Sequence, residues 1–247
     1  GINIAVVIDT STSMMAEDLS FGGRRQNRLE AVKAVVADFI DARKDDRVAL
    51  IAFAAKPYVV CPLTADHAWL KTNLDRINFG LMEDGTAIGS ALASAVNRLR
   101  KADGKSKVVI LLTDGINNAG KIDPKAAAKS AEAFGVRVYT IGAGTKGFAP
   151  YPVTDLFGHT VYQNVKIEVD DDMLKEVAAI TGGQYFRATD GESLKDIYKK
   201  IDAMEKVKFE DIGYRQYEEH FKGVLLWALV LLLLEAVLSR TVFLKIP

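Results

Sequence analysis

The chain has 247 residues, with 32 basic and 32 acidic side chains, so its formal net charge is zero, and 49% of its residues are hydrophobic. One soluble domain plus an appendage is the economical interpretation of this length and composition. A neutral chain offers nucleic acid no electrostatic attraction, so we expect no nucleic-acid partner. The single cysteine, Cys61, cannot form a disulfide within the chain and is expected to be a small buried apolar residue.

Apolar runs alternate with amphipathic segments along most of the sequence. The chain begins without an initiator methionine, directly before the first apolar run, so we expect natural sequence to precede Gly1. Continuous apolar runs are typical of strands buried on both faces, and helical spacing of apolar residues is typical of packed helices. Strands are predicted at residues 2–8, 47–53, 56–63, 107–112, 136–141 and 184–187. Helices are predicted at 28–42, 66–77, 86–99, 124–134, 170–180 and 194–206.

This order of elements predicts an α/β fold with a doubly wound, mostly parallel sheet. The strand at 56–63 follows its predecessor closely enough to hairpin back against it as one antiparallel edge strand. Residues 144–168, rich in glycine, proline and aromatic residues, are expected to form an irregular insertion or a small hairpin. Arg24, Arg25 and Arg28 form the one notable basic cluster, which we interpret as a solvated loop and helix start.

Side chains that carry oxygen follow two of the predicted strands. Asp9, Ser11 and Ser13 follow the first strand at alternate positions, Asp114 follows the fourth, and Thr86 lies in a tight turn that opens a helix. Ligands of such sheets bind beyond the carboxyl ends of the strands, where the strand order reverses. Mg²⁺ prefers oxygen ligands in near-octahedral geometry, so these residues predict a Mg²⁺ site, with Mn²⁺ or Ca²⁺ as alternatives. Helix capping by the Ser and Thr hydroxyls is the competing interpretation.

The same five residues, in the same order, resemble the metal-ion-dependent adhesion site (MIDAS) of von Willebrand factor A domains. The resemblance spans about residues 1–205. It implies that Ser11, Ser13 and Thr86 contact the metal directly and that Asp9 and Asp114 do so directly or through water. A metal held in this way is only partly neutralised, so its natural further ligand is an Asp or Glu of another protein. The resemblance also implies that binding of that carboxylate is linked to movement of the last helix.

The surrounding segments resemble the bacterial aerotolerance (Bat-type) membrane proteins, in particular their BatA branch. The segments that carry this resemblance are 27–31, 45–48, 61–64, 85–89, 114–120 and 181–186. Position 116 departs from it, because many relatives carry an acidic residue where this chain has Ile116. The resemblance implies a role in stress or oxygen tolerance, with other Bat-type membrane proteins and a MoxR-type AAA+ ATPase as partners.

The residues after the predicted domain change character. From residue 221 to residue 238 the only charged side chains are Lys222 and Glu235, both near the ends, which predicts a helix in the lipid bilayer rather than a buried or amphipathic one. The predicted domains are a von Willebrand factor A domain with its MIDAS at 1–207, a juxtamembrane connector at 208–220, a transmembrane helix at 221–239 and a short basic tail at 240–247. Basic residues on the two sides favour opposite orientations, and we follow the family in placing the domain outside the cytoplasm of a bacterial cell.

Three functions fit these observations. The leading hypothesis is a membrane-anchored, metal-dependent protein-binding module that assembles a bacterial envelope complex. The same site would serve an extracellular adhesin, although the short connection to the bilayer favours a neighbouring membrane protein as ligand. The third is a metal-dependent phosphate-ester hydrolase with Asp9 as nucleophile. We expect no enzymatic activity, because the three histidines, His67, His159 and His220, lie in no motif that positions a general acid or base.

Overall fold

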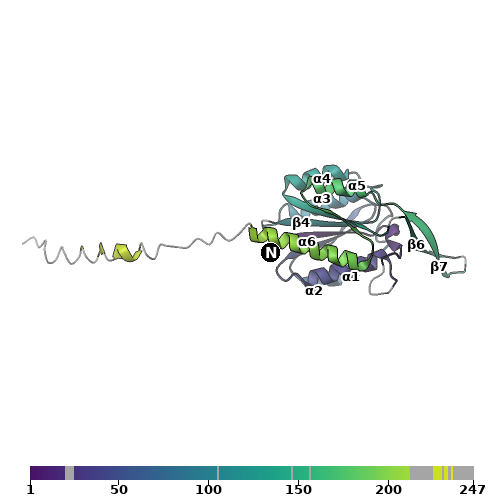
Figure 1. Ribbon diagram of the computed structural model, residues 1–247, viewed down its shortest axis with the longest axis horizontal. Helices are drawn as coiled ribbons and strands as arrows, with labels where there is room; N and C mark the ends of the chain where they lie inside the picture. The colour runs from purple at the N-terminus through teal and green to yellow at the C-terminus, as the bar shows by residue number, and fades with distance from the viewer. Residues whose placement is uncertain are drawn as a thin grey trace, which may run out of the picture. The chain divides into compact units, whose positions relative to one another are not determined.

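Six strands form one sheet, in the order β3-β2-β1-β4-β5-β8 (Figure 1). The computed structural model describes residues 1–19, 25–104, 106–145, 147–155 and 157–211, with short stretches at 225–229, 231–232 and 235. The strands are β1 (Asn3–Asp9), β2 (Arg47–Phe53), β3 (Pro57–Thr64), β4 (Lys107–Thr113), β5 (Val136–Ala143) and β8 (Tyr185–Ala188). All neighbours run parallel except β2 and β3. The α/β fold with a mostly parallel sheet and one antiparallel edge strand is therefore confirmed.

Helices cover both faces of this sheet. The helices α1 (Arg28–Asp41), α2 (His67–Asp75) and α6 (Gly191–Asp211) lie on one face, and α3 (Ile88–Leu99), α4 (Pro124–Ala133) and α5 (Asp171–Ile180) on the other. Within β1, Ile4, Val6 and Ile8 belong to the first core while Ala5 and Val7 belong to the second. A strand packed on both faces has no position for a polar side chain, which explains why β1 is a continuous apolar run.

Side chains just before several helices fix where those helices begin. Asn27, Asp66, Asp123 and Asp170 each accept a hydrogen bond from a backbone N–H in the first turn of the helix that follows. Asp170 thereby caps α5 (Asp171–Ile180). The third helix begins at Ile88, two residues later than predicted, because the Ala87 backbone, with φ −97° and ψ 63°, is not helical. The Thr86 N–H before it donates to the Asn118 side chain.

The segment predicted as an irregular insertion or small hairpin is a hairpin with long arms. The strands β6 (Gly147–Thr154) and β7 (Thr160–Ile167) pair antiparallel along their whole length and project beyond the carboxyl end of β5 (Figure 1). Pro150 and Pro152 stand opposite Asn164 and Tyr162. Proline has no N–H for the ladder, so both prolines occupy positions whose backbone faces away from β7. Accordingly, the Pro150 carbonyl accepts a hydrogen bond from Glu17 N–H outside the hairpin.

The chain divides into two compact units, Gly1–Lys206 and Val207–Pro247. In the second unit the structure describes the end of α6 and a short helical stretch whose leucines and Trp227 are exposed. The predicted connector at 208–220 and transmembrane helix at 221–239 lie mostly outside the described residues, and the basic tail at 240–247 lies wholly outside them. Within the described residues, no helix is both long enough and apolar enough to cross a membrane.

Candidate metal site

The first and fourth strands deliver two carboxylates to the same edge of the sheet. Asp9 is the last residue of β1, and Asp114 directly follows β4. The two strands are parallel neighbours in which Ile8 lies beside Leu112. The chain leaves β1 toward β2 on one side and returns to β4 on the other, so the two aspartates lie where the strand order reverses, the usual ligand position in such sheets.

Asp9 is fully buried and holds the loop that follows it. Its Oδ1 accepts a hydrogen bond from the Ser11 N–H at 2.9 Å, and its Oδ2 accepts one from the Thr113 hydroxyl at 2.5 Å. Thr113 Oγ1 also accepts a hydrogen bond from Gly115 N–H. Thr113 was not among the predicted site residues. Its position directly before Asp114 is the feature of the sequence that could have indicated it.

The two serines link Asp9 to Asp114. After Ser11 the chain forms a short 3-10 helix, η1 (Thr12–Met15), which turns both serine side chains to the same side. The hydroxyl oxygens of Ser11 and Ser13 lie 3.0 Å apart, and the Ser13 hydroxyl donates to Asp114 Oδ1 at 2.6 Å. Four of the five predicted residues therefore form one connected group.

Thr86, the fifth predicted residue, lies against the loop that carries Asp114. A Cβ at Gly115 would lie 3.1 Å from Thr86 Oγ1, so the loop passes close to this hydroxyl and leaves no room for a side chain there. The turn before Thr86 is tied to the serine loop, since Asp84 accepts hydrogen bonds from Thr12 N–H at 2.9 Å and from the Thr12 hydroxyl at 2.7 Å. The structure thus brings all five predicted residues to one place.

Arg28 corrects the interpretation of the basic cluster as solvated. Arg25 is exposed and Arg24 lies outside the described residues, but Arg28 is fully buried. Its Nη1 donates to Asp114 Oδ2 at 2.6 Å, and its Nε and Nη2 donate to the two Asp18 oxygens, each at 2.6 Å. The close approach of Gly144 completes the pocket, because a Cβ there would lie 2.1 Å from Arg28 Nη2.

Asp114 and Asp18 share this buried cation, and Asp9 has none of its own. Burial, and then the charge of Asp114, raise the pKa of Asp9 to about 7. Burial also raises the pKa of Asp114, although Arg28 and Ser13 oppose the shift. For Asp18, burial alone would raise the pKa, but the hydrogen bonds and charge of Arg28 outweigh it and lower the pKa. The three carboxylates thus carry more negative charge than Arg28 neutralises, which suits a bound cation.

The donor set indicates which kind of cation fits. In the part of the chain that the structure describes, no group of three or more His, Cys, Asp or Glu side chains is placed to hold a metal ion. An ion at this site would depend on the Ser and Thr hydroxyls together with the carboxylates, an all-oxygen set. Such a set favours hard ions such as Mg²⁺, Mn²⁺ or Ca²⁺ over softer ones.

The site and fold have a counterpart among known families. The von Willebrand factor type A domain model matches residues 3–200 of this chain. The chain belongs to this family. Von Willebrand factor type A domains act as metal-dependent modules for protein interaction, and the resemblance inferred from the five oxygen-bearing residues is confirmed at that level.

Bat-type proteins are among the similar solved structures. A conserved hypothetical protein BatB from Bacteroides thetaiotaomicron is 29% identical, with a TM-score of 0.69, over 83% of this chain and 100% of that one. An aerotolerance-related membrane protein from Bacteroides fragilis is 28% identical, with a TM-score of 0.67, over 81% of this chain and 98% of that one. The assignment to the BatA branch remains a prediction.

Two further similarities support fewer conclusions, because one covers only part of the relative and the other is low in identity. A UPF0353 protein from Mycolicibacterium paratuberculosis is 32% identical over 86% of this chain, but this chain spans only 61% of that relative. The proximal thread matrix protein 1 of the mussel byssus, in a structure with a zinc occupied MIDAS motif, is 23% identical, with a TM-score of 0.61 over 81% of this chain and 44% of that one. At that identity the similarity extends to the fold alone.

Proposed function

We propose that the site around Asp9 and Asp114 binds a divalent cation, Mg²⁺ in the first place, and that the cation recognises an acidic residue of another protein. Ser11, Ser13 and Thr86 would hold the ion directly, and the two aspartates directly or through water. The bound ion would supply a partly neutralised positive charge that attracts a carboxylate. The observation that carries this proposal is the convergence of two buried aspartates and the serine hydroxyls at one edge of the sheet, with Asp9 bonded only to neutral groups.

We further propose that this binding module is membrane-anchored and serves a bacterial envelope complex. The aerotolerance-related membrane protein of Bacteroides fragilis supports this setting by similarity. Residues 221–239 would lie in the lipid bilayer, with the domain on the periplasmic side. By the same resemblance, the partners would be other Bat-type membrane proteins and a MoxR-type AAA+ ATPase, in a role connected with oxygen tolerance or stress.

The proposal favours binding over phosphate-ester hydrolysis because of where the described histidines lie. His67 contacts the backbone carbonyl of Asp46, just before the start of β2, at the opposite end of the sheet from Asp9. His159 pairs with Asp155 at the tip of the hairpin. Neither is placed to transfer a proton at the candidate metal site. An extracellular adhesin would use the same site, and the capture experiment below separates it from the envelope complex.

Titration of the full 247-residue chain with Mg²⁺ in a calorimeter tests the metal site. We expect saturable binding by the unmodified chain and none by Asp9→Ala. The second step is capture of partners from the parent membranes in the presence of Mg²⁺ or EDTA. Envelope proteins recovered only with Mg²⁺ and intact Asp9 would support the proposal, whereas equal recovery under all conditions would contradict it.

A further inference from the structure

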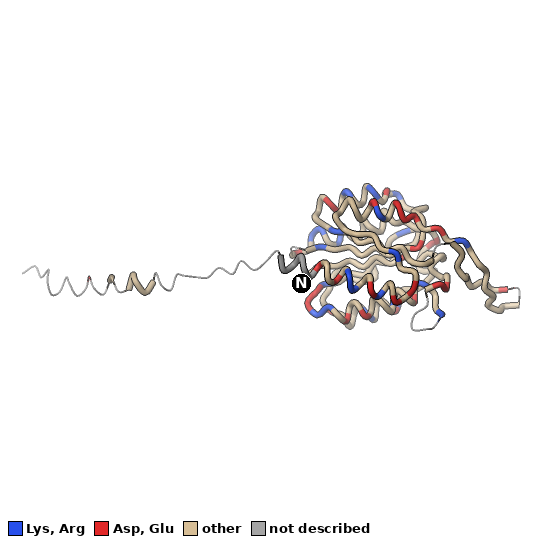
Figure 2. The backbone as a smooth tube through the Cα atoms, in the orientation of Figure 1, with Lys and Arg blue, Asp and Glu red and all other residues tan. Residues whose placement is uncertain are grey.

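The β6–β7 hairpin exposes an unusually uncharged surface. β6 has no charged residue and β7 has only Lys166, so the hairpin contrasts with the helices, which carry many red and blue positions (Figure 2). Phe148 and Tyr162 are exposed on one face of the hairpin, and Val161 and Val165 are exposed on the other. Exposed apolar side chains on an element with so few charges indicate an interaction surface.

The hairpin is fixed relative to the candidate metal site. Glu17 N–H donates to the Pro150 carbonyl at 2.8 Å, and the Tyr151 hydroxyl donates to Met15 Sδ at 3.4 Å. A small apolar cluster joins the same two segments and consists of Ala16, Ala149 and Ile167, with Tyr151 packed against it. The loop that carries Ser11 and Ser13 therefore continues directly into the support of the hairpin, and a ligand would meet a preorganised surface.

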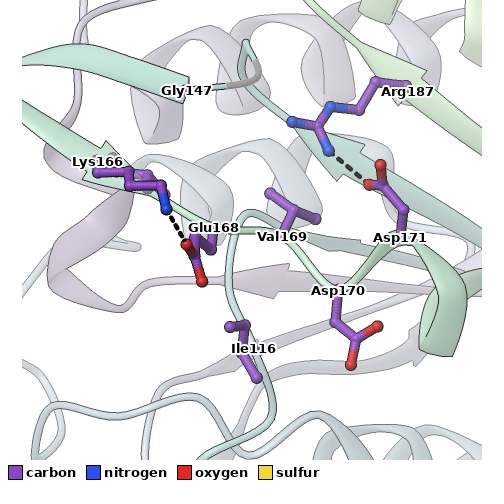
Figure 3. Close-up of a pocket in the computed structure, with 9 residues that line it drawn as sticks. Ile116, Gly147, Lys166, Glu168, Val169, Asp170, Asp171 and Arg187 are labelled. Carbon is purple, nitrogen blue, oxygen red and sulfur yellow. Dashed lines mark hydrogen bonds and ion pairs between the residues drawn. The ribbon is translucent and has the colours of Figure 1, made fainter.

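A groove runs from the candidate metal site along the base of the hairpin. One cavity, of about 460 Å³, is lined by Ser13 and Thr86 at one end and by Tyr151 and Val165 of the hairpin. A second cavity, of about 340 Å³, is shown in Figure 3. The two cavities share the lining residues Ile116, Lys166, Ile167 and Glu168. They are therefore two parts of one groove, with the half-exposed Ile116 side chain at the junction.

The charge of the groove changes from one end to the other. Lys166 pairs with Glu168 at the junction, and Arg187 pairs with Asp171 at the far end, on either side of Val169 (Figure 3). Asp170 also lines the far end, so two carboxylates there face one cationic group. The near end would carry the positive charge of the bound ion, so the groove would be positive at one end, apolar at Ile116 and negative at the other.

We propose that this groove binds an extended segment of the partner protein, a proposal that rests on the metal-dependent function above. An acidic residue of the segment ligates the ion, a neighbouring apolar side chain packs against Ile116 and Val165, and a basic residue beyond it meets the carboxylates at the far end. The hairpin thereby determines which acidic residues of other proteins are accepted, since a carboxylate without an apolar neighbour loses the contact with Ile116 and Val165.

Short synthetic peptides test this inference with the full chain purified in detergent and loaded with Mg²⁺. The peptides contain Asp, Leu and Lys in this order or in the reverse order, and matched sets replace Leu by Ser or Asp by Asn. We expect one of the two orders to bind at least about tenfold more tightly than the other and than its Ser counterpart. Peptides with Asn in place of Asp should not bind in any set.

Neutral substitutions locate the contact without changing the charge near the ion. Ile116→Gln and Val165→Gln should each weaken binding of the preferred peptide by about tenfold while leaving Mg²⁺ affinity unchanged. Ile122→Gln is a matched control, because Ile122 is 41% exposed and Ile116 is 43% exposed. Phe148→Gln is the second control, since the alternation of side chains places Phe148 on the opposite face of the hairpin from Val165.

The outcomes separate the two proposals. Binding that needs Mg²⁺ and Asp, but ignores the order of residues, the Leu and the Ile116 and Val165 variants, would overturn the groove while leaving the metal-dependent function in place. Peptide binding that persists in EDTA or in Asp9→Ala would overturn both proposals. If no peptide binds while the chain still binds Mg²⁺ in the calorimeter, the groove proposal alone is overturned.

Discussion

Two buried carboxylate clusters, at opposite ends of the sheet, have opposite charge balance. Near the start of β5, Glu205 of α6 pairs with Arg137, accepts a hydrogen bond from the Tyr139 hydroxyl at 2.5 Å and accepts another from Ser106 Oγ at 3.2 Å. At the carboxyl ends of β1 and β4, Asp9 receives hydrogen bonds only from neutral groups. A buried carboxylate that already pairs with a cation is costly to remove from the fold, whereas one without a cation is available to bind one.

Sequence position alone does not distinguish these two clusters. Glu205 lies in a predicted amphipathic helix and Asp9 at the end of a predicted strand, and both are acidic residues in ordinary globular composition. The two clusters differ in the number of cationic side chains within hydrogen-bonding distance of the carboxylate. This number can be obtained only from the three-dimensional structure. The following variants test whether the difference in charge balance has the expected consequences.

Removing the charge of Asp9 should have the largest effect and should act in opposite directions on binding and stability. Asp9→Asn keeps an acceptor for the Thr113 hydroxyl but removes one buried charge. We expect Mg²⁺ affinity to fall by about 100-fold or more, while the metal-free variant unfolds at a temperature roughly 2–4 °C higher than the metal-free parent. Calorimetric titration and thermal unfolding measure the two quantities. A metal-free variant less stable than its parent would contradict the charge argument.

Removing the Glu205 carboxylate should lower the stability of the fold and leave Mg²⁺ affinity nearly unchanged. Glu205→Ala leaves Arg137, Tyr139 and Ser106 without their shared acceptor, and we expect a loss of about 3 kcal/mol in the free energy of unfolding, near the lower end for broken buried pairs because Arg137 is partly exposed. Denaturant unfolding measures this change. Mg²⁺ affinity should stay within about twofold of the parent value. A large loss of Mg²⁺ affinity would show that the two clusters are coupled.

The metal affinity should depend on pH in the direction set by Asp9. Its raised pKa means that the metal-free fold is most stable with Asp9 protonated, and that this stability is lost as the pH rises from about 4 through about 7. Protons and Mg²⁺ therefore compete, and the Kd for Mg²⁺ at pH 5 should exceed the plateau value above pH 7 by about 100-fold. Titrations across this range provide the measurement. A Kd that is constant between pH 5 and pH 7 would exclude Asp9 as the competing group.

A single hydroxyl should contribute less than a charge. Ser13→Ala removes one proposed ligand and the hydrogen bond to Asp114, and we expect the Kd for Mg²⁺ to rise by about tenfold, or roughly 1.4 kcal/mol. Ser193→Ala is a suitable control, because Ser193 bonds to Thr189 and Asp190, directly before the start of α6. An equal effect of the two substitutions would argue against direct coordination by Ser13.

Much of the fold and site was predictable because the signals are local. β2 begins and ends where its apolar run predicts, and four of the five oxygen-bearing residues meet because the parallel neighbours β1 and β4 end at the same edge. The burial of Arg28 was not predictable, because it depends on Asp18 and on the absence of a side chain at Gly144, far apart in the sequence. The groove was not predicted for the same reason, because Ile116 lines it together with residues of the β6–β7 hairpin, which come later in the sequence.

The prolines of the hairpin affect the tendency of the chain to associate with copies of itself. An exposed apolar hairpin invites pairing with a second copy of itself along its open edges, which is the first step of aggregation. Along the outer edge of β6, Pro150 and Pro152 offer no N–H, and the Pro150 carbonyl is already bonded to Glu17. Both features disfavour the addition of a further strand at the β6 edge, so they limit self-association through this strand.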